Sequence, residues 1–507
     1  MARRGRSPRD RRAQRPVRPT AHRRNLRYPF EPDRVLSDDE VHHIHAEAKR
    51  LLQEHGMKVL LPEAREIYAA AGAAVGDDEM VRIPAEIVDE AVASAPAVVE
   101  VGAPDPAKAI TIGADHVNFM PVGGPPFVSD LDHGRRPGTL ADYEAFMKLF
   151  QGFDVLHANM PFVEAQDIPV DVRHLHITRS QLTLTDKPAF LFTRGRQRVQ
   201  DMFEMLRIRH GLDEDEFADT PLVWANINTN SPRQLDVPMA LGIIDMARAG
   251  QVCGMTPFTL AGAMAPVSLA GALLLQHAEA LAAITLAQLT RAGAPVIYGG
   301  FTSNVDLRSG SPAFGTPEAM QGAVATGQLA RLIEVPWRSS GSSASPTEDA
   351  QGAWETMFNL QGAMRGGANF IMHSAGWQEG GLVASFEKLI LDVEILHTIV
   401  ESWQPVDTSV DELAFDAIAA VEPGGHFFGE PHTLERFETA FYDPLVATRA
   451  SFEQWVEEGE LDARTRANAV WKQRVADYEQ PPIDDAVVAE LDEFVARRTA
   501  EGGAPPD

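Results

Sequence analysis

A histidine ends one of several short apolar runs in the second half of the chain. His373 closes the run Asn369–His373, and a loop rich in small residues follows it. An imidazole at such a place can hydrogen-bond a substrate carboxylate or guide a cofactor, because it changes charge near neutral pH. It can also be a structural histidine that bonds a backbone carbonyl. Both interpretations stay open on the residues alone, and we take His373 as the candidate catalytic residue.

Aromatic residues lie at or just past the ends of the same kind of run. A ring face attracts a quaternary ammonium group by about 0.5–2 kcal/mol, so several rings together could bind such a substrate. Aromatic residues also fill protein cores, and we expect about two of the five to line the site. The predicted substrate-binding residues are these five and three polar neighbours: Phe258, Tyr298, Phe301, Trp337, Trp377, Asn226, Arg338 and Glu379.

Eight strand-like runs alternate with helical patterns along the middle of the chain. The runs are Val117–Met120, Val155–Met160, Ala189–Thr193, Leu222–Ile227, Val252–Pro257, Val296–Phe301, Val335–Arg338 and Asn369–His373. The helical patterns are Leu140–Phe150, Val172–Leu184, Gln197–Arg209, Pro238–Ala249, Leu269–Thr290, Pro317–Leu332, Asp349–Met364 and Leu382–Val400. Eight such units predict an α/β fold, a (β/α)8 TIM barrel over residues 116–400, with the site at the C-terminal ends of its strands.

Three further regions complete the predicted organisation. Residues 1–27 contain eleven arginines and form a predicted disordered Arg/Pro-rich arm. Residues 28–115 form a predicted N-terminal helical lobe, in which Ser37 and Glu40 match the capping box that begins a helix. Residues 401–507 are acidic and helical, which predicts a C-terminal helical extension that acts as a cap or forms an oligomer.

The composition is that of an ordinary globular protein. Of 507 residues, 44% are hydrophobic and 23% are charged. No long apolar run is free of charge and no secretory signal occurs, so we expect no membrane span and a cytoplasmic location. The single cysteine, Cys253, excludes an internal disulfide. A net charge of −27 argues against nucleic acid as a partner.

Neither a nucleotide site nor a metal site is predicted. The glycines 299–300 and the Gly-Ser stretch 339–343 match neither a P-loop nor a dinucleotide-binding turn. The neighbouring histidines at 42–45 and 174–176 lie on predicted helices without a matching set of carboxylates, and no HExxH or Cys/His ligand set occurs. We therefore expect that the chain holds no metal.

Several motifs, in the same order, resemble the trimethylamine methyltransferase family. The resemblance extends from about Leu36 to about Pro481. Within the family, the chain resembles the members without pyrrolysine, such as glycine betaine methyltransferase. The motifs are Gly123-Gly124-Pro125, Gln166-Asp167-Ile168-Pro169, Phe314-Gly315-Thr316-Pro317-Glu318, Gly327-Gln328-Leu329-Ala330-Arg331, Asp349-Ala350-Gln351, His373-Ser374-Ala375-Gly376-Trp377 and Glu379-Gly380-Gly381-Leu382.

This resemblance implies a TIM barrel that moves a methyl group from an amine to the cobalt of a separate corrinoid protein. It implies that no cofactor is held permanently and that a partner presents the cobalamin. Arg338 or His373 would then orient a betaine carboxylate. The residues predicted to face the corrinoid are Gly123, Gly124, Ser340 and Gly341.

The predicted activity is methyl transfer from a quaternary amine, glycine betaine or a similar compound, by a homo-oligomer. One alternative is a methyltransferase for trimethylamine or another methylated amine. A second is a TIM-barrel protein that binds betaine without catalysis. A lyase or aldolase would need a lysine at a strand end or a set of metal-binding carboxylates, and none of the eight predicted strands ends in lysine.

Overall fold

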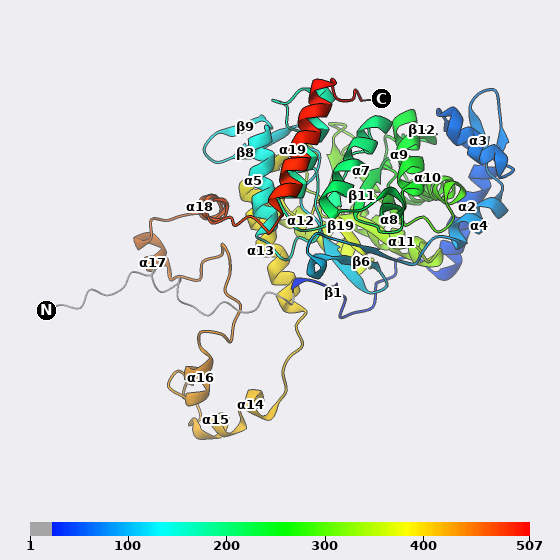
Figure 1. Cartoon of the computed structure of the whole chain (residues 1–507). Coiled ribbons are helices and arrows are strands. Elements are labelled where there is room, and N and C mark those ends of the chain that lie inside the picture. The colour runs from blue at the N-terminus through cyan, green and yellow to red at the C-terminus, as the bar shows by residue number, and fades with distance from the viewer. Residues whose placement is uncertain (1–22, 507) are drawn as a thin grey trace.

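The computed structural model describes residues 23–506, so the part of the predicted arm numbered 1–22 lies outside the described residues. Its centre is a curved eight-stranded sheet (Figure 1). In spatial order, the strands are β1 (Leu26–Arg27), β7 (His116–Phe119), β19 (Phe370–Met372), β18 (Trp337–Ser340), β15 (Val296–Gly299), β13 (Val252–Met255), β11 (Val223–Ile227) and β10 (Ala189–Phe190). All neighbours pair in parallel except β1, which is antiparallel to β7.

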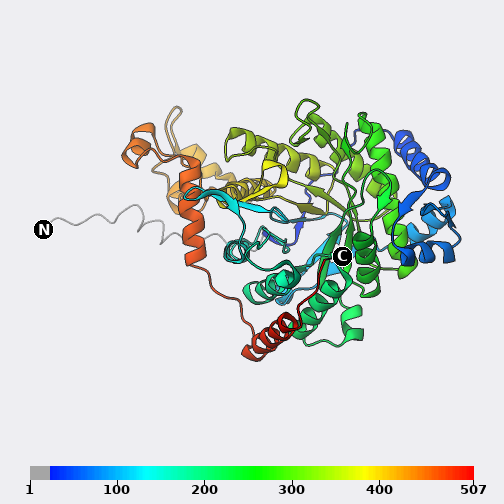
Figure 2. The ribbon, with the colours of Figure 1, turned by 90° about the horizontal axis from the view of Figure 1, so that it is seen from above.

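Eight helices surround the sheet where the sequence predicts them (Figure 2). Six of them begin with a side chain that accepts a hydrogen bond from the first turn, such as Thr139 before α5 and Thr316 before α11. The helices are α5 (Leu140–Gln151), α6 (Val170–Leu184), α7 (Arg196–His210), α9 (Val237–Arg248), α10 (Leu269–Thr290), α11 (Pro317–Leu332), α12 (Ala350–Arg365) and α13 (Phe386–Ser402), and a short α8 (Glu214–Ala218) follows α7.

The predicted strand Val155–Met160 is not a strand, so a closed barrel of eight assigned strands is not confirmed. The segment lies between β7 and β10 but makes one backbone bond to each side. The N–H of His157 donates to the carbonyl of Phe119 (2.8 Å), and that of Asn159 donates to Pro188 (2.9 Å). The N–H of Phe119 donates to Nδ1 of His157 instead of to a backbone carbonyl (2.8 Å). The imidazole thus replaces a ladder bond, which prevents regular pairing.

Apolar side chains fill the inside of the curved sheet. Trp224 and Phe370 meet there with ring centroids 4.6 Å apart. The antiparallel hairpin of β5 (Val98–Val101) and β6 (Ile110–Gly113) adds buried valine and isoleucine side chains to the same cluster. This hairpin therefore closes the end of the sheet away from the C-terminal ends of the strands.

The N-terminal lobe packs on α10. The predicted capping box is confirmed, since Ser37 accepts from the N–H of Glu40 and Glu40 bonds back to Ser37. The helix α10 is long and apolar enough to cross a membrane by length and composition, but 78% of its most apolar window is buried inside the protein. It is a core helix. The lobe contains α2 (Asp38–Glu54), α3 (Pro62–Ala70), α4 (Ala85–Ala93) and a small sheet of β2 (Met57–Val59), β3 (Ala74–Val75), β4 (Met80–Arg82) and β12 (Gln234–Leu235).

The C-terminal region begins with four short helices outside the body, α14 (Val410–Leu413), α15 (Phe415–Ala420), α16 (Pro431–Arg436) and α17 (Phe452–Glu457) (Figure 1). Two longer helices then return to the body: α18 (Ala463–Ala476) packs on α13, and α19 (Asp485–Ala500) packs on α6 and α7. Smaller strands at the loops are β8 (Phe127–Asp130), β9 (Gly134–Pro137), β14 (Leu260–Ala261), β16 (Ser303–Val305), β17 (Pro312–Ala313), β20 (Trp377–Gln378) and β21 (Val383–Ser385).

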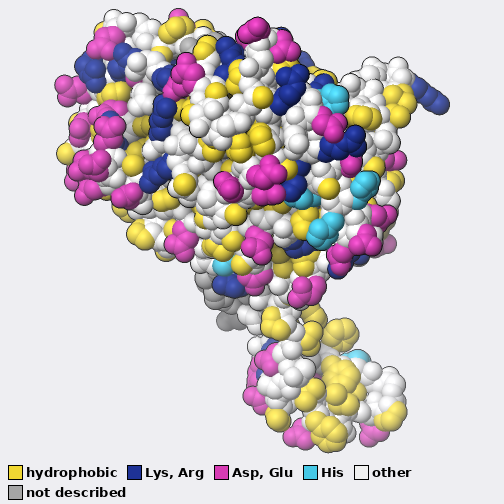
Figure 3. Space-filling view, turned by 90° about the vertical axis from the view of Figure 1, so that its right-hand side faces the viewer, with side chains coloured by type: hydrophobic (Ala, Val, Ile, Leu, Met, Phe, Trp, Pro, Cys, Tyr) yellow, Lys and Arg dark blue, Asp and Glu magenta, His cyan; other side chains and the backbone are white. Residues whose placement is uncertain are grey.

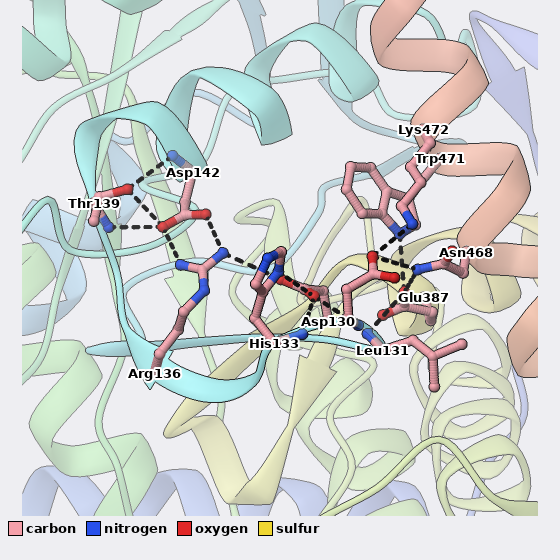
Figure 4. Close-up of polar contacts among 11 residues, drawn as sticks. Asp130, Leu131, His133, Arg136, Thr139, Asp142, Glu387, Asn468, Trp471 and Lys472 are labelled. Carbon is pink, nitrogen blue, oxygen red and sulfur yellow. Dashed lines mark hydrogen bonds and ion pairs between the residues drawn. The ribbon is translucent and has the colours of Figure 1, made fainter.

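A buried carboxylate joins α13, α18 and the β8–β9 turn (Figure 4). Oε1 of Glu387 accepts from the backbone N–H of Leu131 (3.2 Å), the amide of Asn468 (2.8 Å) and the indole of Trp471 (2.9 Å).

In the β8–β9 turn, Asp130, Asp132 and His133 bring possible metal ligands within 4.8 Å of one another. Their carboxylates already bond Arg136 and Lys472, so protein cations neutralise this group.

Candidate active site

A cavity of about 620 Å³ opens at the C-terminal ends of the parallel strands. This is the end at which barrels of this class carry their sites. Eight of the thirteen predicted site residues line it: Gly123, Gly124, Asn226, Phe258, Phe301, Arg338, His373 and Trp377. The other lining residues include Met160, Phe190, Phe192, Arg194, Asn228, Asp236, Met372 and Pro506.

His373 lies directly after β19, with a positive φ of 55°. Few residues other than glycine adopt this conformation, and its cost points to a constrained position. The ring lies against Trp377, with centroids 3.9 Å apart, and its buried Nδ1 has no hydrogen-bond partner among the residues that the structure describes. Burial and the charge of Arg338 hold the pKa of His373 well below its usual value. The imidazole is therefore neutral at physiological pH.

Arg338 brings a positive charge into the cavity from β18. It is 3% exposed, and its Nε lies 2.8 Å from the sulfur of Met372. A weaker contact of 3.4 Å joins it to the carbonyl of Gly300. Within residues 23–506, no carboxylate forms an ion pair with this guanidinium. Burial lowers its pKa to about 9, so it stays protonated at neutral pH and lacks a counter-anion.

Aromatic rings form one side of the cavity. Phe301 lies 4.9 Å from Phe258 and 6.3 Å from His373 between ring centroids. Trp377 extends this wall and lies 6.4 Å from Phe314. A Cβ at Gly381 would lie 2.4 Å from the indole of Trp377, so only glycine leaves the ring this position. The wall presents ring faces and edges beside the charge of Arg338.

Three of the predicted substrate-binding residues lie outside the cavity. Tyr298 is fully buried behind the sheet, where its hydroxyl bonds Nδ1 of His277 (2.9 Å). Trp337 belongs to the core between the sheet and its helices. Glu379 lies at the rim, and its carboxylate bonds Nε of Arg135 (2.9 Å). Tyr298 and Trp337 pair across β15 and β18, so both point to the same outer face.

The residues predicted to face the corrinoid lie at two places. Gly123 and Gly124 line the cavity, and the space around a Cβ at Gly124 is open. Ser340 faces a smaller neighbouring cavity of about 30 Å³, and its hydroxyl lies 2.8 Å from that of Ser342. Gly341 packs under the loop, since a Cβ there would lie 2.8 Å from Leu360.

Asn226 ends β11 within a short chain of polar contacts. Its Oδ1 accepts from the hydroxyl of Thr256 (2.8 Å), and its amide donates to Asn228 (3.1 Å). Asn228 in turn donates to the carbonyl of Thr256 (2.9 Å). These contacts fix the Asn226 side chain, which can present its amide to a ligand.

Buried carboxylates outside the cavity hold the loops that form it. Oε2 of Glu355 accepts from the hydroxyl of Ser343 (2.8 Å) and from the N–H groups of Ala344 (2.8 Å) and Ser345 (3.0 Å). Asp392 accepts from the N–H of Gly376 (2.9 Å), and Lys388 bonds its other oxygen. The loops after β18 and β19 are therefore tied to α12 and α13.

Two parts of the cavity wall were not predicted from the sequence. Phe190 and Phe192 alternate along one strand-like run, so a period of two could have indicated that they share a face. Pro506 had no sequence signal, because only tertiary contacts bring the C-terminal segment over the sheet (Figure 2). Nε of Arg198 donates to the carbonyl of Ala504 (2.9 Å), and the N–H of Ala504 donates to Asp171 (2.9 Å).

A family model described as trimethylamine methyltransferase (MTTB) matches residues 2–503. The chain belongs to this family. It is 36% identical over 471 residues to the glycine betaine methyltransferase of Desulfitobacterium hafniense (strain Y51), covering 92% of this chain and 98% of the relative. It is 29% identical over 473 residues to the trimethylamine methyltransferase MttB of Desulfitobacterium hafniense (strain DSM 10664 / DCB-2), covering 92% and 94%.

Among solved structures, the monomethylamine methyltransferase (MtmB) of Methanosarcina barkeri superposes with a TM-score of 0.48 at 10% identity, over 87% of this chain and 94% of that one. The family membership confirms the resemblance found in the sequence. It makes the chain a member of a methyltransferase family whose named relatives act on glycine betaine and on trimethylamine.

Proposed function

We propose that the protein transfers a methyl group from a quaternary amine carrying a carboxylate, glycine betaine or a close analogue, to the Co(I) of a corrinoid protein. The observation that carries the proposal is the buried guanidinium of Arg338, which lines the cavity without a carboxylate partner among the described residues. A buried charge is costly unless it is paired, so this site favours an anionic ligand group. Trimethylamine has no such group.

The aromatic wall supports the second half of the substrate. Phe301, Phe258 and Trp377 lie beside Arg338 and could surround a trimethylammonium group. The guanidinium lies over Phe301, 5.3 Å from its ring centroid, so that ring already interacts with one cation. In a bound betaine, the carboxylate would lie between the guanidinium and the ammonium and would reduce their repulsion.

The chemistry requires positioning more than acid–base catalysis. A methyl group on a quaternary nitrogen leaves behind a neutral tertiary amine, so no proton has to move when the carbon–nitrogen bond breaks. The neutral imidazole of His373, whose Nδ1 has no partner within residues 23–506, could donate a hydrogen bond to the substrate carboxylate or guide the approach of the acceptor. The cavity walls would hold the methyl group in line and exclude water.

A corrinoid carried by a partner would supply a strong cobalt nucleophile at the mouth. The open space at Gly124, on the wall of the cavity, leaves room for such a group there. Gly123 and Gly124 would contact it, while Ser340 and Gly341 would shape the loop behind it. The chain itself would hold no permanent cofactor. We place the protein in the cytoplasm and propose that it works as a homo-oligomer.

The test mixes the purified protein with cob(I)alamin and a panel of methylated amines and follows methylcobalamin by absorbance. We expect product with glycine betaine, little with tetramethylammonium or trimethylamine, and loss of product in His373→Ala. Equal rates with trimethylamine would favour the trimethylamine alternative. Betaine binding by calorimetry without methylation, even with corrinoid proteins supplied, would favour the non-catalytic alternative.

A further inference from the structure

A segment of the C-terminal region has almost no buried residues. We call residues 404–461 the projecting arm; it contains α14 to α17 and leaves the body at the end of α13. Val446 is its one buried residue. The backbone N–H of Val446 (2.6 Å) and the hydroxyl of Tyr442 (2.9 Å) donate to Glu394 of α13. These contacts attach the end of the arm near α18, while α14 to α16 have no buried residues.

The arm exposes large apolar side chains. It contains thirteen of the twenty-five exposed large hydrophobic residues described in the chain. Those on and around α14 to α16 gather on the lobe that projects from the body (Figure 3). Phe428 is 81% exposed and Phe441 is 80% exposed. The thirteen are Val406, Val410, Leu413, Phe415, Ile418, Phe427, Phe428, Leu434, Phe437, Phe441, Phe452, Val456 and Leu461.

Such a surface needs a cover. The exposed apolar area of these side chains is on the order of 1,000 Å², above the roughly 300–600 Å² of the largest patch on a typical monomer. Its helices have four to six residues, too short to be stable alone. Since the arm has no core of its own, its conformation depends on contacts that it receives from outside.

The position of the arm indicates which kind of partner covers its apolar surface. The cavity opens at the C-terminal ends of the strands, whereas α13 runs back antiparallel to them, so the arm begins at the opposite end of the body (Figure 1). A partner that delivers a methyl acceptor must approach the cavity and then leave. The arm needs a cover that is always present, and a second copy of the chain meets that need.

We propose that the projecting arm is the interface with a second copy of this chain. In a two-fold pair each copy contributes the same surface, so the estimated area per copy exceeds the roughly 800 Å² of a standard interface. The arm also contains thirteen acidic residues and two basic ones, a net charge of 2 − 13 = −11. Two such arms repel, and salt screens that repulsion, so the pair tightens as ionic strength rises.

The mass in solution tests the proposal. Sedimentation equilibrium of the full chain, 55.3 kDa, at micromolar concentration should give at least twice that mass. The double variant Phe428→Glu and Phe441→Glu should lower the mass to that of one chain. Both rings are exposed, so the variant removes nothing from the core, and unchanged far-UV circular dichroism verifies the fold. The control Val75→Glu places the same charge on an exposed valine of the N-terminal lobe and should keep the wild-type mass.

Cross-linking identifies the contacting surface. Cys253 is buried, and burial raises the pKa of its thiol, so a cysteine introduced by Phe428→Cys is the reactive one. A benzophenone attached there should cross-link two chains on illumination, and one at Val75→Cys should not. A wild-type chain that stays monomeric would overturn the proposal. So would a double variant that keeps the wild-type mass, because the interface would then lie elsewhere.

Discussion

The guanidinium of Arg338 lies over the ring of Phe301, with Cζ 5.3 Å from the ring centroid. The two residues come from the ends of neighbouring parallel strands, β18 and β15, and both line the cavity. One supplies a buried positive charge and the other an aromatic face. A ligand with a carboxylate at one end and a quaternary ammonium at the other matches both features, and substitutions of the two residues separate their contributions to binding.

Replacing Arg338 by glutamine should abolish recognition of the carboxylate. A hydrogen bond to a charged group contributes about 1.5–3 kcal/mol, so the Kd for glycine betaine should rise about 10- to 200-fold. Tetramethylammonium, which has no carboxylate, should bind Arg338→Gln no more weakly than the wild type. Isothermal titration calorimetry measures both. Arg194→Gln is the matched control, because Arg194 lines the same cavity but is exposed; an equal loss in both variants would contradict a specific role for Arg338.

Replacing Phe301 by leucine should weaken binding of the ammonium. A cation–π contact of about 0.5–2 kcal/mol corresponds to a Kd increase of about 2- to 30-fold. The neutral isostere 3,3-dimethylbutanoate has a tert-butyl group in place of trimethylammonium and should lose much less affinity. Competition titrations give the ratio of the two affinities. If that ratio is the same in the wild type and in Phe301→Leu, the ring does not recognise charge.

Replacing Tyr298 by phenylalanine should affect stability and leave ligand binding unchanged. The hydroxyl bonds buried His277, and its loss leaves an unsatisfied imidazole, at a cost of about 1–3 kcal/mol in the free energy of unfolding. Denaturant unfolding and betaine titration measure the two quantities. Phe301→Leu should show the opposite pattern, weaker binding with a smaller change in stability. A Tyr298→Phe protein that folds as well as the wild type but binds betaine poorly would place Tyr298 in the site.

The buried His157 should make stability depend on pH. Burial, assisted by the charge of Arg24, lowers its pKa to about 3, whereas an unfolded chain has a pKa of about 6.5. Below about pH 6.5 the unfolded chain takes up a proton that the folded chain does not, so stability is full above this pH and falls as the pH decreases. The slope from this one group is about 1.4 kcal/mol per pH unit.

His157→Gln should therefore flatten the plot of unfolding free energy against pH between about pH 6 and pH 4 by that slope. Urea unfolding at several pH values gives the plot. Leu156→Ala is the control: it loosens the neighbouring packing and should lower stability by the same amount at every pH. If His157→Gln also moves the curve down without changing its slope, the imidazole does not titrate as the burial implies.

The C-terminal segment should contribute to the cavity wall through its contact with α6. A Cβ at Gly503 would lie 2.2 Å from the carbonyl of Asp171, so Gly503→Ala should displace Pro506. We expect the Kd for glycine betaine to rise about 3- to 10-fold, since part of the wall is lost. Gly502→Ala is the matched control, because Gly502 also has a positive φ but open space around its Cβ. If both variants raise the Kd equally, the cause is backbone strain and not the displacement of Pro506.

Local signals in the sequence were enough to predict the alternation of strands and helices. Capping residues and apolar periodicity are local, so the helices α10 and α11 begin and end at the predicted residues. The sequence also indicated that His373, Arg338 and Phe301 lie at strand ends. The motifs were sufficient to identify the family, which the match over residues 2–503 confirms.

Which of two neighbouring residues on a strand faces the cavity depends on how the sheet packs against its helices. Successive side chains alternate between the two faces, so Arg338 points into the cavity while Trp337 points to the helices. In the same way, Ile297 points to the inside of the sheet and Tyr298 points to the helices. A strand buried on both faces is apolar throughout, and its sequence does not tell inside from outside. The irregular segment at His157 and the arrival of Pro506 depend on contacts between residues far apart in the chain, which no local pattern encodes.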